Sequence, residues 1–419
     1  MRTQSTRTPE LLAPAGGLAQ LEAALRFGAD AVYLAADRFG LRQRAANFAL
    51  DDVPAAAALV HDAGAKAYVT LNALMDADDL KALPAYLEAL AAAGVDAFIV
   101  SDLGALRLAQ RYAPNVELHV STQASVCNAE AARVWHELGA SRVVCAREMS
   151  VEDIARLRAG APRELELEAF VHGAMCMAVS GRCLLSSAMA GRSGNRGHCA
   201  QPCRWSYALV EEQRPGEFFP VEEDVRGTYV MNAQDLNMLA HLDDLAAAGI
   251  DSFKIEGRNK KAFYVASVVR AYRLALDGVP SSELADELLA VSHRPYGTGF
   301  YYGDARQSPD VDGYTAECRH AATVEACEPA GEGAFRVIAR CYNRFCEGDE
   351  LEALSPGPHI PLVRVRNLAW LPAPDGDDAQ PKRVPVAVAN RSAERAMRSK
   401  RGRRLAPGDF LRMRINVER

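Results

Sequence analysis

No stretch of about eighteen uncharged apolar residues occurs in the 419-residue chain, and residues 1–9 are polar and basic with no apolar segment behind them. Because a membrane-spanning helix or a secretory leader needs such a segment, we expect no membrane association and a cytoplasmic location. Cysteine is also scarce, at ten residues. That number is too small for a disulfide scaffold, so clustered cysteines are expected to be metal ligands or catalytic thiols.

Several catalytic signatures are missing as well. No G-x-G-x-x-G fingerprint follows the first predicted strand, which argues against a dinucleotide-binding fold. The chain has no H-E-x-x-H, no G-x-S-x-G and no cysteine-protease signature. A peptidase would therefore need a site that these patterns do not reveal.

Basic residues gather at one end of the chain. The formal charge is -6, but residues 391–419 hold ten Lys or Arg against three acidic residues. This end therefore carries +7 and the rest of the chain -13. A basic end on an acidic body is compatible with docking a polyanion, and equally with a solvated tail that has no partner.

Short apolar runs alternate with longer amphipathic stretches from Glu10 to Gly278, a pattern typical of βα units. Helices are expected, for example, over residues 18–27, 79–93, 129–138 and 262–277. A glycine that ends a helix precedes several strands by two or three residues, at Gly28, Gly94, Gly139 and Gly249. Eight runs are predicted as strands: Glu10–Gly16, Asp30–Ala36, Lys66–Ala73, Asp96–Asp102, Glu117–Thr122, Arg142–Glu148, Leu165–Gly173 and Ser252–Gly257. The predicted fold class is α/β, a TIM-like (βα)8 barrel, with an open doubly wound sheet as the alternative.

Active sites of such barrels lie at the carboxyl ends of the strands, so polar residues at the predicted strand ends are site candidates. Taken singly, each is better explained as a satisfied polar residue of the barrel rim, and it is their clustering that suggests a site. They are Asn72, Asp102, Ser121, Thr122, Gln123, Arg147, Glu148, His172, Glu256 and Arg258, together with Asn232 from the segment before the last strand.

The alternation breaks over residues 174–249 and stops after Val279. The first break predicts a cysteine-rich insertion, at about residues 174–228, within a barrel domain of residues 1–309. After the βα alternation stops at Val279, short alternating runs at residues 335–340, 362–365 and 384–388 predict a small C-terminal β-barrel domain. This second domain covers residues 310–419 and includes the basic end.

Cys176, Cys183, Cys199 and Cys203 lie within 28 residues, in a stretch rich in glycine. Four thiolates so close in sequence can converge on one ion or cluster, because glycines put no side chains in the way. Zinc and an iron-sulfur cluster both accept four thiolates, and spacing alone does not choose between them. The cysteines at positions 127, 145, 318, 327, 341 and 346 are instead expected to be buried as small apolar side chains.

Several segments resemble the collagenase-like U32 peptidase family. The similarity spans roughly residues 10–303, and its cysteine-rich part is specific enough to make chance an unsatisfactory explanation. The segments are Phe170–Cys176, Ser180–Ser186, Asn195–Cys199 and Pro202–Trp205 around the cysteines, and Leu12–Gly16, Ser121–Gln123 and Lys254–Arg258, with Tyr264 and Tyr272, elsewhere.

This resemblance points toward bacterial members that act as hydroxylation factors on ubiquinone precursors, on a ribosomal RNA cytidine, or on the wobble uridine of transfer RNA. It implies a [4Fe-4S] cluster on Cys176, Cys183, Cys199 and Cys203. Chain length and the β domain look most like the transfer-RNA branch, which forms 5-hydroxyuridine in a process that depends on prephenate. The basic end is consistent with that branch, since Lys and Arg supply much of any RNA affinity through phosphate contacts.

The implied partners are therefore transfer RNA and prephenate, and the oligomeric state is left open. We expect Glu256, Arg258, His172 and Arg147 to line the pocket, since the planar forks of the arginines suit a dicarboxylate such as prephenate. Two alternatives remain. One is a peptidase, as the family name implies, and the other is a non-catalytic iron-sulfur factor that only binds RNA.

Overall fold

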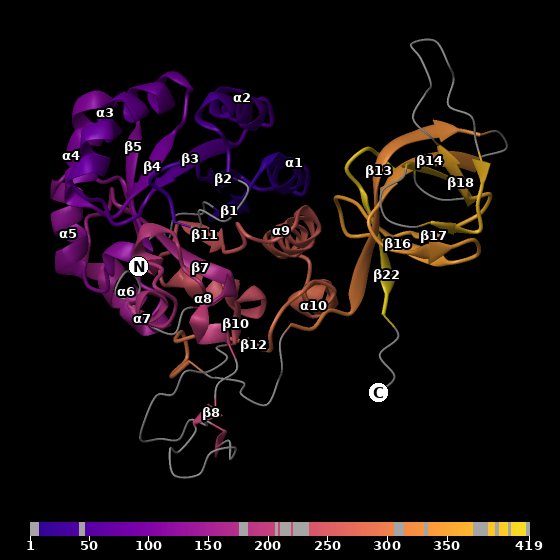
Figure 1. Ribbon diagram of the computed structural model, residues 1–419. Coiled ribbons are helices and arrows are strands. Elements are labelled where there is room, and N and C mark those ends of the chain that lie inside the picture. The colour runs from indigo at the N-terminus through magenta and orange to yellow at the C-terminus, as the bar shows by residue number, and fades with distance from the viewer. Residues whose placement is uncertain are drawn as a thin grey trace. The chain divides into compact units, whose positions relative to one another are not determined.

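The computed structural model describes residues 8–41, 47–175, 183–205, 208–209, 219–220, 234–305, 314–330, 334–371, 384–389, 394–400 and 404–415. The chain divides into two compact units, whose helices and strands are labelled in Figure 1. The first unit consists of Met1–Val265 and His293–Tyr314, and the second of Ala266–Ser292 and Thr315–Arg419.

Eight parallel strands form a closed ring in the first unit. Neighbours pair in the order β11-β1-β2-β3-β4-β5-β6-β7, and a parallel pairing between β7 and β11 closes the ring. The strands are β1 (Glu10–Ala15), β2 (Ala31–Leu34), β3 (Lys66–Leu71), β4 (Ala97–Val100), β5 (Glu117–Val120), β6 (Arg142–Val144), β7 (Glu166–Ala174) and β11 (Ser252–Ile255). All eight predicted strands are present, so the TIM-like barrel is confirmed and the open sheet is excluded.

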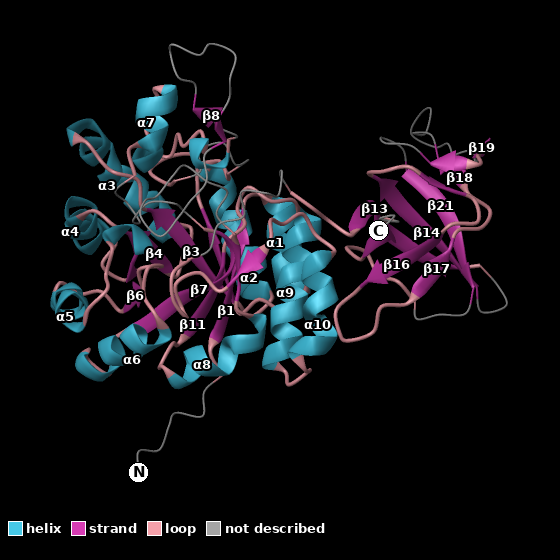
Figure 2. Cartoon of the chain, turned by 90° about the horizontal axis from the view of Figure 1, so that it is seen from below, coloured by secondary structure: helices cyan, strands magenta, loops and turns pink. Residues whose placement is uncertain are grey.

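Helices surround this ring of strands (Figure 2). They are α1 (Leu18–Arg26), α2 (Val53–Asp62), α3 (Ala77–Ala92), α4 (Leu103–Tyr112), α5 (Ala129–Glu137), α6 (Val151–Gly160) and α8 (Leu242–Ala247), with the short turns η1 (Leu50–Asp52), η2 (Thr122–Ala124) and η5 (Leu239–His241). Helix α9 (Ala262–Leu276) runs from the first unit into the second.

Local signals at the helix ends explain where these elements begin and stop. Asp76 and Asp79 form a reciprocal capping box at the start of α3, and Ser150 and Asp153 form another at the start of α6. The four glycines expected to end helices all have a positive φ, between 81° and 101°. The repeat recognised in the sequence therefore has the conformational cause that was predicted for it.

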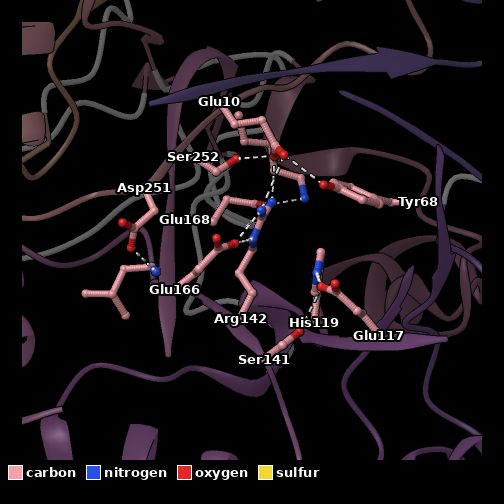
Figure 3. A network of polar contacts seen from close by, with 12 residues as sticks. Glu10, Tyr68, Glu117, His119, Ser141, Arg142, Glu166, Glu168, Asp251 and Ser252 are labelled. Atoms are coloured by element: carbon pink, nitrogen blue, oxygen red, sulfur yellow. Dashed lines mark hydrogen bonds and ion pairs between the residues drawn. The ribbon is translucent and has the colours of Figure 1, made fainter. Parts of the chain in front are cut away.

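The amino-terminal half of the barrel interior is charged (Figure 3). Arg142 of β6 is 3% exposed, and its guanidinium binds Glu10 at 2.6 Å, Glu166 at 2.6 Å and Glu168 at 3.1 Å. Lys254 of β11 donates to the second oxygen of Glu168 at 2.6 Å. We call these five residues the Arg142 network. Its members come from β1, β6, β7 and β11, so it links both sides of the seam where the ring closes.

Two further strands extend the sheet beyond the ring. Strand β10 (Asp235–Asn237) pairs antiparallel with the end of β7, and β12 (Tyr296–Gly297) pairs parallel with β10. Neither strand was predicted. The insertion between β7 and β10 contributes α7 (Leu185–Ala190), η3 (Gly194–Arg196), η4 (Pro202–Arg204), β8 (Ala208–Leu209) and β9 (Phe219–Pro220).

The second unit contains an eight-stranded antiparallel sheet in the order β17-β16-β22-β13-β14-β21-β18-β19, and a separate pair of β15 with β20. Its strands are β13 (Cys318–Pro329), β14 (Ala334–Cys341), β15 (Phe345–Cys346), β16 (Glu350–Leu354), β17 (Leu362–Arg364), β18 (Ala369–Leu371), β19 (Val384–Pro385), β20 (Val388–Ala389), β21 (Glu394–Lys400) and β22 (Phe410–Arg414). The predicted β domain is present, and its described strands form a half-barrel.

Helix α10 (Ser281–Leu289), which was not predicted, belongs to this second unit together with most of α9. Arg270 of α9 donates to the carbonyl of Ser355 at 3.1 Å, and Glu287 of α10 binds Arg412 of β22 at 2.8 Å. The sequence-based boundary after residue 309 leaves both helices with the barrel. These buried polar contacts explain why they group with the β strands instead.

Candidate functional site

The carboxyl ends of β7 and β11 bring two of the predicted pocket residues together. Ile255 pairs with His172 across the two strands, and the backbone N–H of Glu256 donates to the carbonyl of His172 at 2.9 Å. Gly173 permits this approach, because a Cβ there would lie 2.4 Å from the carbonyl oxygen of Glu256. Its φ of 103° also disfavours any other residue.

Glu256 is half-buried and is contacted by two tyrosine hydroxyls, one at its carboxylate and one at its backbone carbonyl. Tyr33 of β2 donates to Oε2 of Glu256 at 3.3 Å and to the carbonyl of Ile255 at 3.0 Å. Tyr264 of α9 donates to the carbonyl of Glu256 at 3.3 Å. These bonds fix the backbone on both sides of Glu256, so its carboxylate is held at the barrel end in a defined position.

His172 is 1% exposed and lies among aromatic rings. The ring centroid of Tyr296 is 5.4 Å from that of His172, and Tyr264 is 6.0 Å away. Burial lowers the pKa of His172 to about 3, and the positive charge of Lys260 acts in the same direction. The imidazole is therefore neutral near pH 7, which suits a hydrogen-bonding group rather than a cation.

A buried ion pair beside His172 was missed by the sequence analysis. Asp235 of β10 accepts from Nη2 of Arg294 at 2.7 Å and from its Nε at 3.0 Å, and both residues are at most 2% exposed. His293 stacks on Tyr296 with centroids 4.4 Å apart. The Pro and Gly between His293 and Gly299 are typical of a turn-rich connector, and they obscured the short strand β12 in the sequence. The polar and aromatic residues His293, Arg294 and Tyr296, so close together in the sequence, were the signal that could have indicated a functional segment here.

The two predicted arginines each have partners within the barrel. Arg258 is 4% exposed, and its guanidinium donates to Oγ1 of Thr70 on β3 at 3.0 Å and to the carbonyl of Leu41. Arg147 is half-buried, donates to the carbonyl of Ala174 at 2.8 Å and lies 3.9 Å from the centroid of the Phe170 ring. Arg147 therefore lies beside β7, whereas Arg258 reaches across to β3.

Other candidates at the strand ends have structural partners. Asp102 caps α4 through the N–H of Ala105, and Thr122 donates to the carbonyl of Cys145. The amide of Asn72 donates to the hydroxyl of Ser121, so β3 and β5 are joined across β4. These contacts match the alternative interpretation of a satisfied barrel rim. Asn232 lies outside the described residues.

Three of the four clustered cysteines lie in one compact part of the insertion. Cys183 comes just before α7, Cys199 follows η3 and Cys203 lies in η4, and α7 packs against both of these turns. Cys176 lies outside the described residues. In the described part of the chain, no three His, Cys, Asp or Glu residues form a group that could hold a metal ion. The predicted set needs Cys176 as well and stays a prediction.

The chemistry of the three described thiols fits a thiolate-bound cluster. All three are partly exposed, whereas Cys145, Cys318, Cys327 and Cys341 are buried. The backbone N–H of Gln201 donates to Sγ of Cys199 at 3.3 Å, and such N–H to sulfur bonds tune clusters held by thiolates. A Cβ at Gly194 would lie 3.7 Å from the same sulfur, an ordinary van der Waals distance, so this glycine lies close beside Cys199.

The insertion is held against the barrel by Arg196 of η3. Its guanidinium lies 3.0 Å from both Asp76 and Asp79, the capping pair of α3. The N–H of Leu74 also donates to the carbonyl of Asn195 at 2.8 Å. The turn before Cys199 is therefore anchored to the rim at the carboxyl end of β3.

The remaining cysteines follow the prediction with two exceptions. Buried positions are Cys145, Cys318, Cys327 and Cys341. Cys127 is exposed and Cys346 is partly exposed, so the expected burial is wrong for these two. Cys127 lies between η2 and α5, in a loop rather than in the barrel wall, which explains its exposure.

A cavity of about 710 Å³ opens at the opposite end of the barrel, where the strands begin. Glu10, Arg142 and Glu166 of the Arg142 network line it, together with Arg158 and Asp251. Barrel enzymes place their chemistry at the carboxyl ends of the strands, whereas residues at the amino end serve stability. We therefore assign the site to the end that carries Glu256, His172 and the cysteine insertion.

Comparison with known proteins gives consistent matches. The sequence profile of peptidase family U32 matches residues 16–310. The "tRNA hydroxylation protein P1" of Bacillus subtilis is 36% identical over 393 residues, 91% of this chain and 91% of that protein. The "tRNA hydroxylation protein P" of Helicobacter pylori strain J99 is 41% identical over 300 residues, 70% and 71% of the two chains. A solved U32 peptidase, 18% identical, covers 61% of this chain and 96% of its own with a TM-score of 0.40. Among the described residues, no helix is long and apolar enough to cross a membrane.

Proposed function

The chain belongs to peptidase family U32, and we propose that it is an enzyme that hydroxylates transfer RNA, converting the wobble uridine to 5-hydroxyuridine. The observation that carries this proposal is the similarity to a relative named a tRNA hydroxylation protein, because it extends over 91% of both chains. That length takes in the β unit as well as the barrel. A relationship through the barrel fold alone would not support a shared substrate.

The proposal includes a [4Fe-4S] cluster on Cys176, Cys183, Cys199 and Cys203. Replacing the C5 hydrogen of uridine by a hydroxyl group is a two-electron oxidation, which carboxylate, imidazole and guanidinium groups cannot perform by themselves. A cluster bound there would supply electron transfer or substrate activation. The partial exposure of Cys183, Cys199 and Cys203 and the N–H bond to Sγ of Cys199 support this assignment.

The pocket residues are proposed to bind and orient the substrates. The half-buried Arg147 presents a guanidinium at the site end, which suits one carboxylate of prephenate as co-substrate. Arg258 fixes the loop after β2 through Leu41, so its main effect is to shape the pocket. Neutral His172 and the carboxylate of Glu256 are suited to accept a proton from the base, or to form a hydrogen bond with the hydroxyl group that the product carries at C5.

The test is nucleoside analysis of transfer RNA from a strain that lacks the gene, complemented with wild type or variants. We expect wild type to restore 5-hydroxyuridine and its derivatives, and Cys199→Ser and Glu256→Gln to fail. Cys127→Ser is the matched control, because this cysteine is exposed and lies outside the insertion. Unaltered wobble nucleosides in the deletion strain would overturn the proposal and favour the peptidase alternative.

The same variants separate an enzyme from a binding factor. If Glu256→Gln restored modification as well as wild type while Cys199→Ser did not, the strand-end residues would be dispensable and the iron-sulfur factor would be favoured. Protein purified without oxygen is expected to contain about four iron and four sulfide per chain. Stoichiometric zinc without iron would contradict the cluster.

A further inference from the structure

A row of rings and cations leads from the surface to His172. Tyr314 is 43% exposed, and the ammonium group of Lys260 lies 4.3 Å from its ring centroid. The same ammonium lies 5.1 Å from the centroid of Tyr264, whose ring is 6.0 Å from that of His172. All these residues belong to the barrel unit. The row therefore connects an exposed aromatic side chain with the site at the end of β7.

The position of Lys260 is set by its backbone. Its N–H donates to the carbonyl of Gly257, and its carbonyl accepts from the amide of Gln20 at 3.1 Å. These bonds hold the turn that follows β11, at the carboxyl end of the barrel. Lys261 next to it is exposed, so two positive charges lie at this rim although the body of the protein is acidic.

We propose that Tyr314 and Lys260 bind the RNA substrate at the rim of the site, where Tyr314 stacks on an unpaired base beside the target uridine and Lys260 contacts the adjoining phosphate. This inference rests on the proposed function. Any base can stack on an exposed tyrosine ring, whatever the sequence. A lysine beside the ring can bind the negatively charged phosphates of a single-stranded loop. Double-stranded RNA offers no such base, so the rim is specific for a loop.

Arg294 supports the geometry from the buried side. Its guanidinium lies 5.8 Å from the Tyr314 centroid while it binds Asp235 at 2.7 Å. The Tyr314 ring therefore lies near one cation that is locked in an ion pair inside the protein and another, Lys260, on a turn at the rim. This arrangement orients the ring, and an oriented ring loses less conformational entropy when a base stacks on it.

Binding of two RNA probes tests the proposal: an anticodon stem-loop with uridine at the wobble position, and a fully paired duplex of equal length. Tyr314→Ala is expected to weaken stem-loop binding by about 5-fold or more, because base stacking on an aromatic ring has that effect, and to leave duplex binding unchanged. Tyr314→Phe keeps the ring and should stay within about 2-fold of wild type. Lys260→Met should lower the salt slope of stem-loop binding by about 0.7 to 0.9.

Tyr112→Ala and Lys66→Met are the matched controls, since Tyr112 ends α4 and Lys66 begins β3 at the opposite end of the barrel. Both should bind the stem-loop as wild type does. If Tyr314→Ala bound it with unchanged affinity while wild type bound RNA and restored modification in cells, this inference would fail and the proposed function would stand. If wild type neither bound RNA nor restored modification, both would fail.

Discussion

Arg142 lies inside the barrel with three glutamates around its guanidinium, so removing it leaves carboxylates where water cannot solvate them freely. Arg142→Met is expected to lower the free energy of unfolding by about 3–5 kcal/mol, because the buried charges lose their partner. Urea unfolding followed by circular dichroism measures this change. Arg156→Met is the control: Arg156 also binds two carboxylates, but it is 64% exposed, so a loss below about 1 kcal/mol is expected. Equal losses in the two variants would contradict the argument.

His172 makes stability depend on pH. Its pKa is about 3 in the folded protein, against about 6.5 in an unfolded chain, so between these values only the unfolded chain binds the proton. The stabilisation from neutral His172 is complete above pH 6.5 and is lost progressively as pH falls from there toward 3. Between pH 7 and pH 5, wild type should lose about 2 kcal/mol more than His172→Gln in urea unfolding. Parallel losses in the two proteins would show that burial does not suppress protonation of His172.

Single residues also show where sequence reasoning succeeds. Glu256 and His172 were predicted from one rule, that barrel sites lie where strands end, and the structure places them side by side. Asp235 and Arg294 were missed because they are 59 residues apart and lie in segments without periodicity. A buried ion pair leaves no local pattern, so only the fold makes it visible.

Among the elements, the turn η3 joins the cysteine insertion to α3 through Arg196. Replacing Arg196 by Met removes this anchor and is expected to weaken iron retention about tenfold, because groups that position cluster ligands affect metal affinity on that scale. The measurement is iron loss to a chelator after anaerobic purification. Lys81→Met is the control. Lys81 also binds an aspartate of α3, Asp78, but its side chain is 78% exposed and it makes no contact that anchors the described part of the insertion. Iron loss at the wild-type rate in both variants would show that the anchor is dispensable.

At this scale the sequence predicted regular elements well and irregular ones poorly. The eight barrel strands were legible because short, mostly apolar runs alternate along the chain with longer amphipathic stretches, even though charged residues of the Arg142 network interrupt several of the runs. Strands β10 and β12 have three and two residues, too few for any period to be visible. Helix α10 was missed because it follows the point where the βα alternation stops.

For the whole molecule, the charge asymmetry predicts how RNA binding depends on salt. Replacing Arg401, Arg403 and Arg404 together by Ala should reduce the salt slope of transfer-RNA binding by about 2 to 3 if each contacts a phosphate. Arg401 and Arg403 lie outside the described residues, and Arg404 donates to the carbonyl of Cys327 at 3.4 Å. Salt titration of binding measures the slope, and an unchanged slope and affinity would identify a solvated surface.

Counting charges along the sequence overstates the basic end. Arg412 is 1% exposed and binds Glu287 and Glu352, and Arg414 binds Glu352 at 2.6 Å. Their charges are neutralised within the second unit by Glu287 and Glu352, which lie between 60 and 125 positions away along the chain. RNA contacts are therefore to be sought in the other basic residues of this end, and Arg412 and Arg414 are unsuitable for the salt test.

The Arg142 network also bears on how the chain is made. Glu10 accepts from Ser252 at 2.9 Å, a bond that spans 242 positions, and Glu168 receives Lys254 only when β11 is in place. During synthesis the first seven strands emerge before the residues that complete this network exist. As long as β11 is missing from the ring, the carboxylate of Glu168 lacks the ammonium group of Lys254, so burying this carboxylate costs free energy. Chains truncated before Ser252 are therefore expected to leave the ring open, with Glu10 lacking Ser252 and Glu168 lacking Lys254.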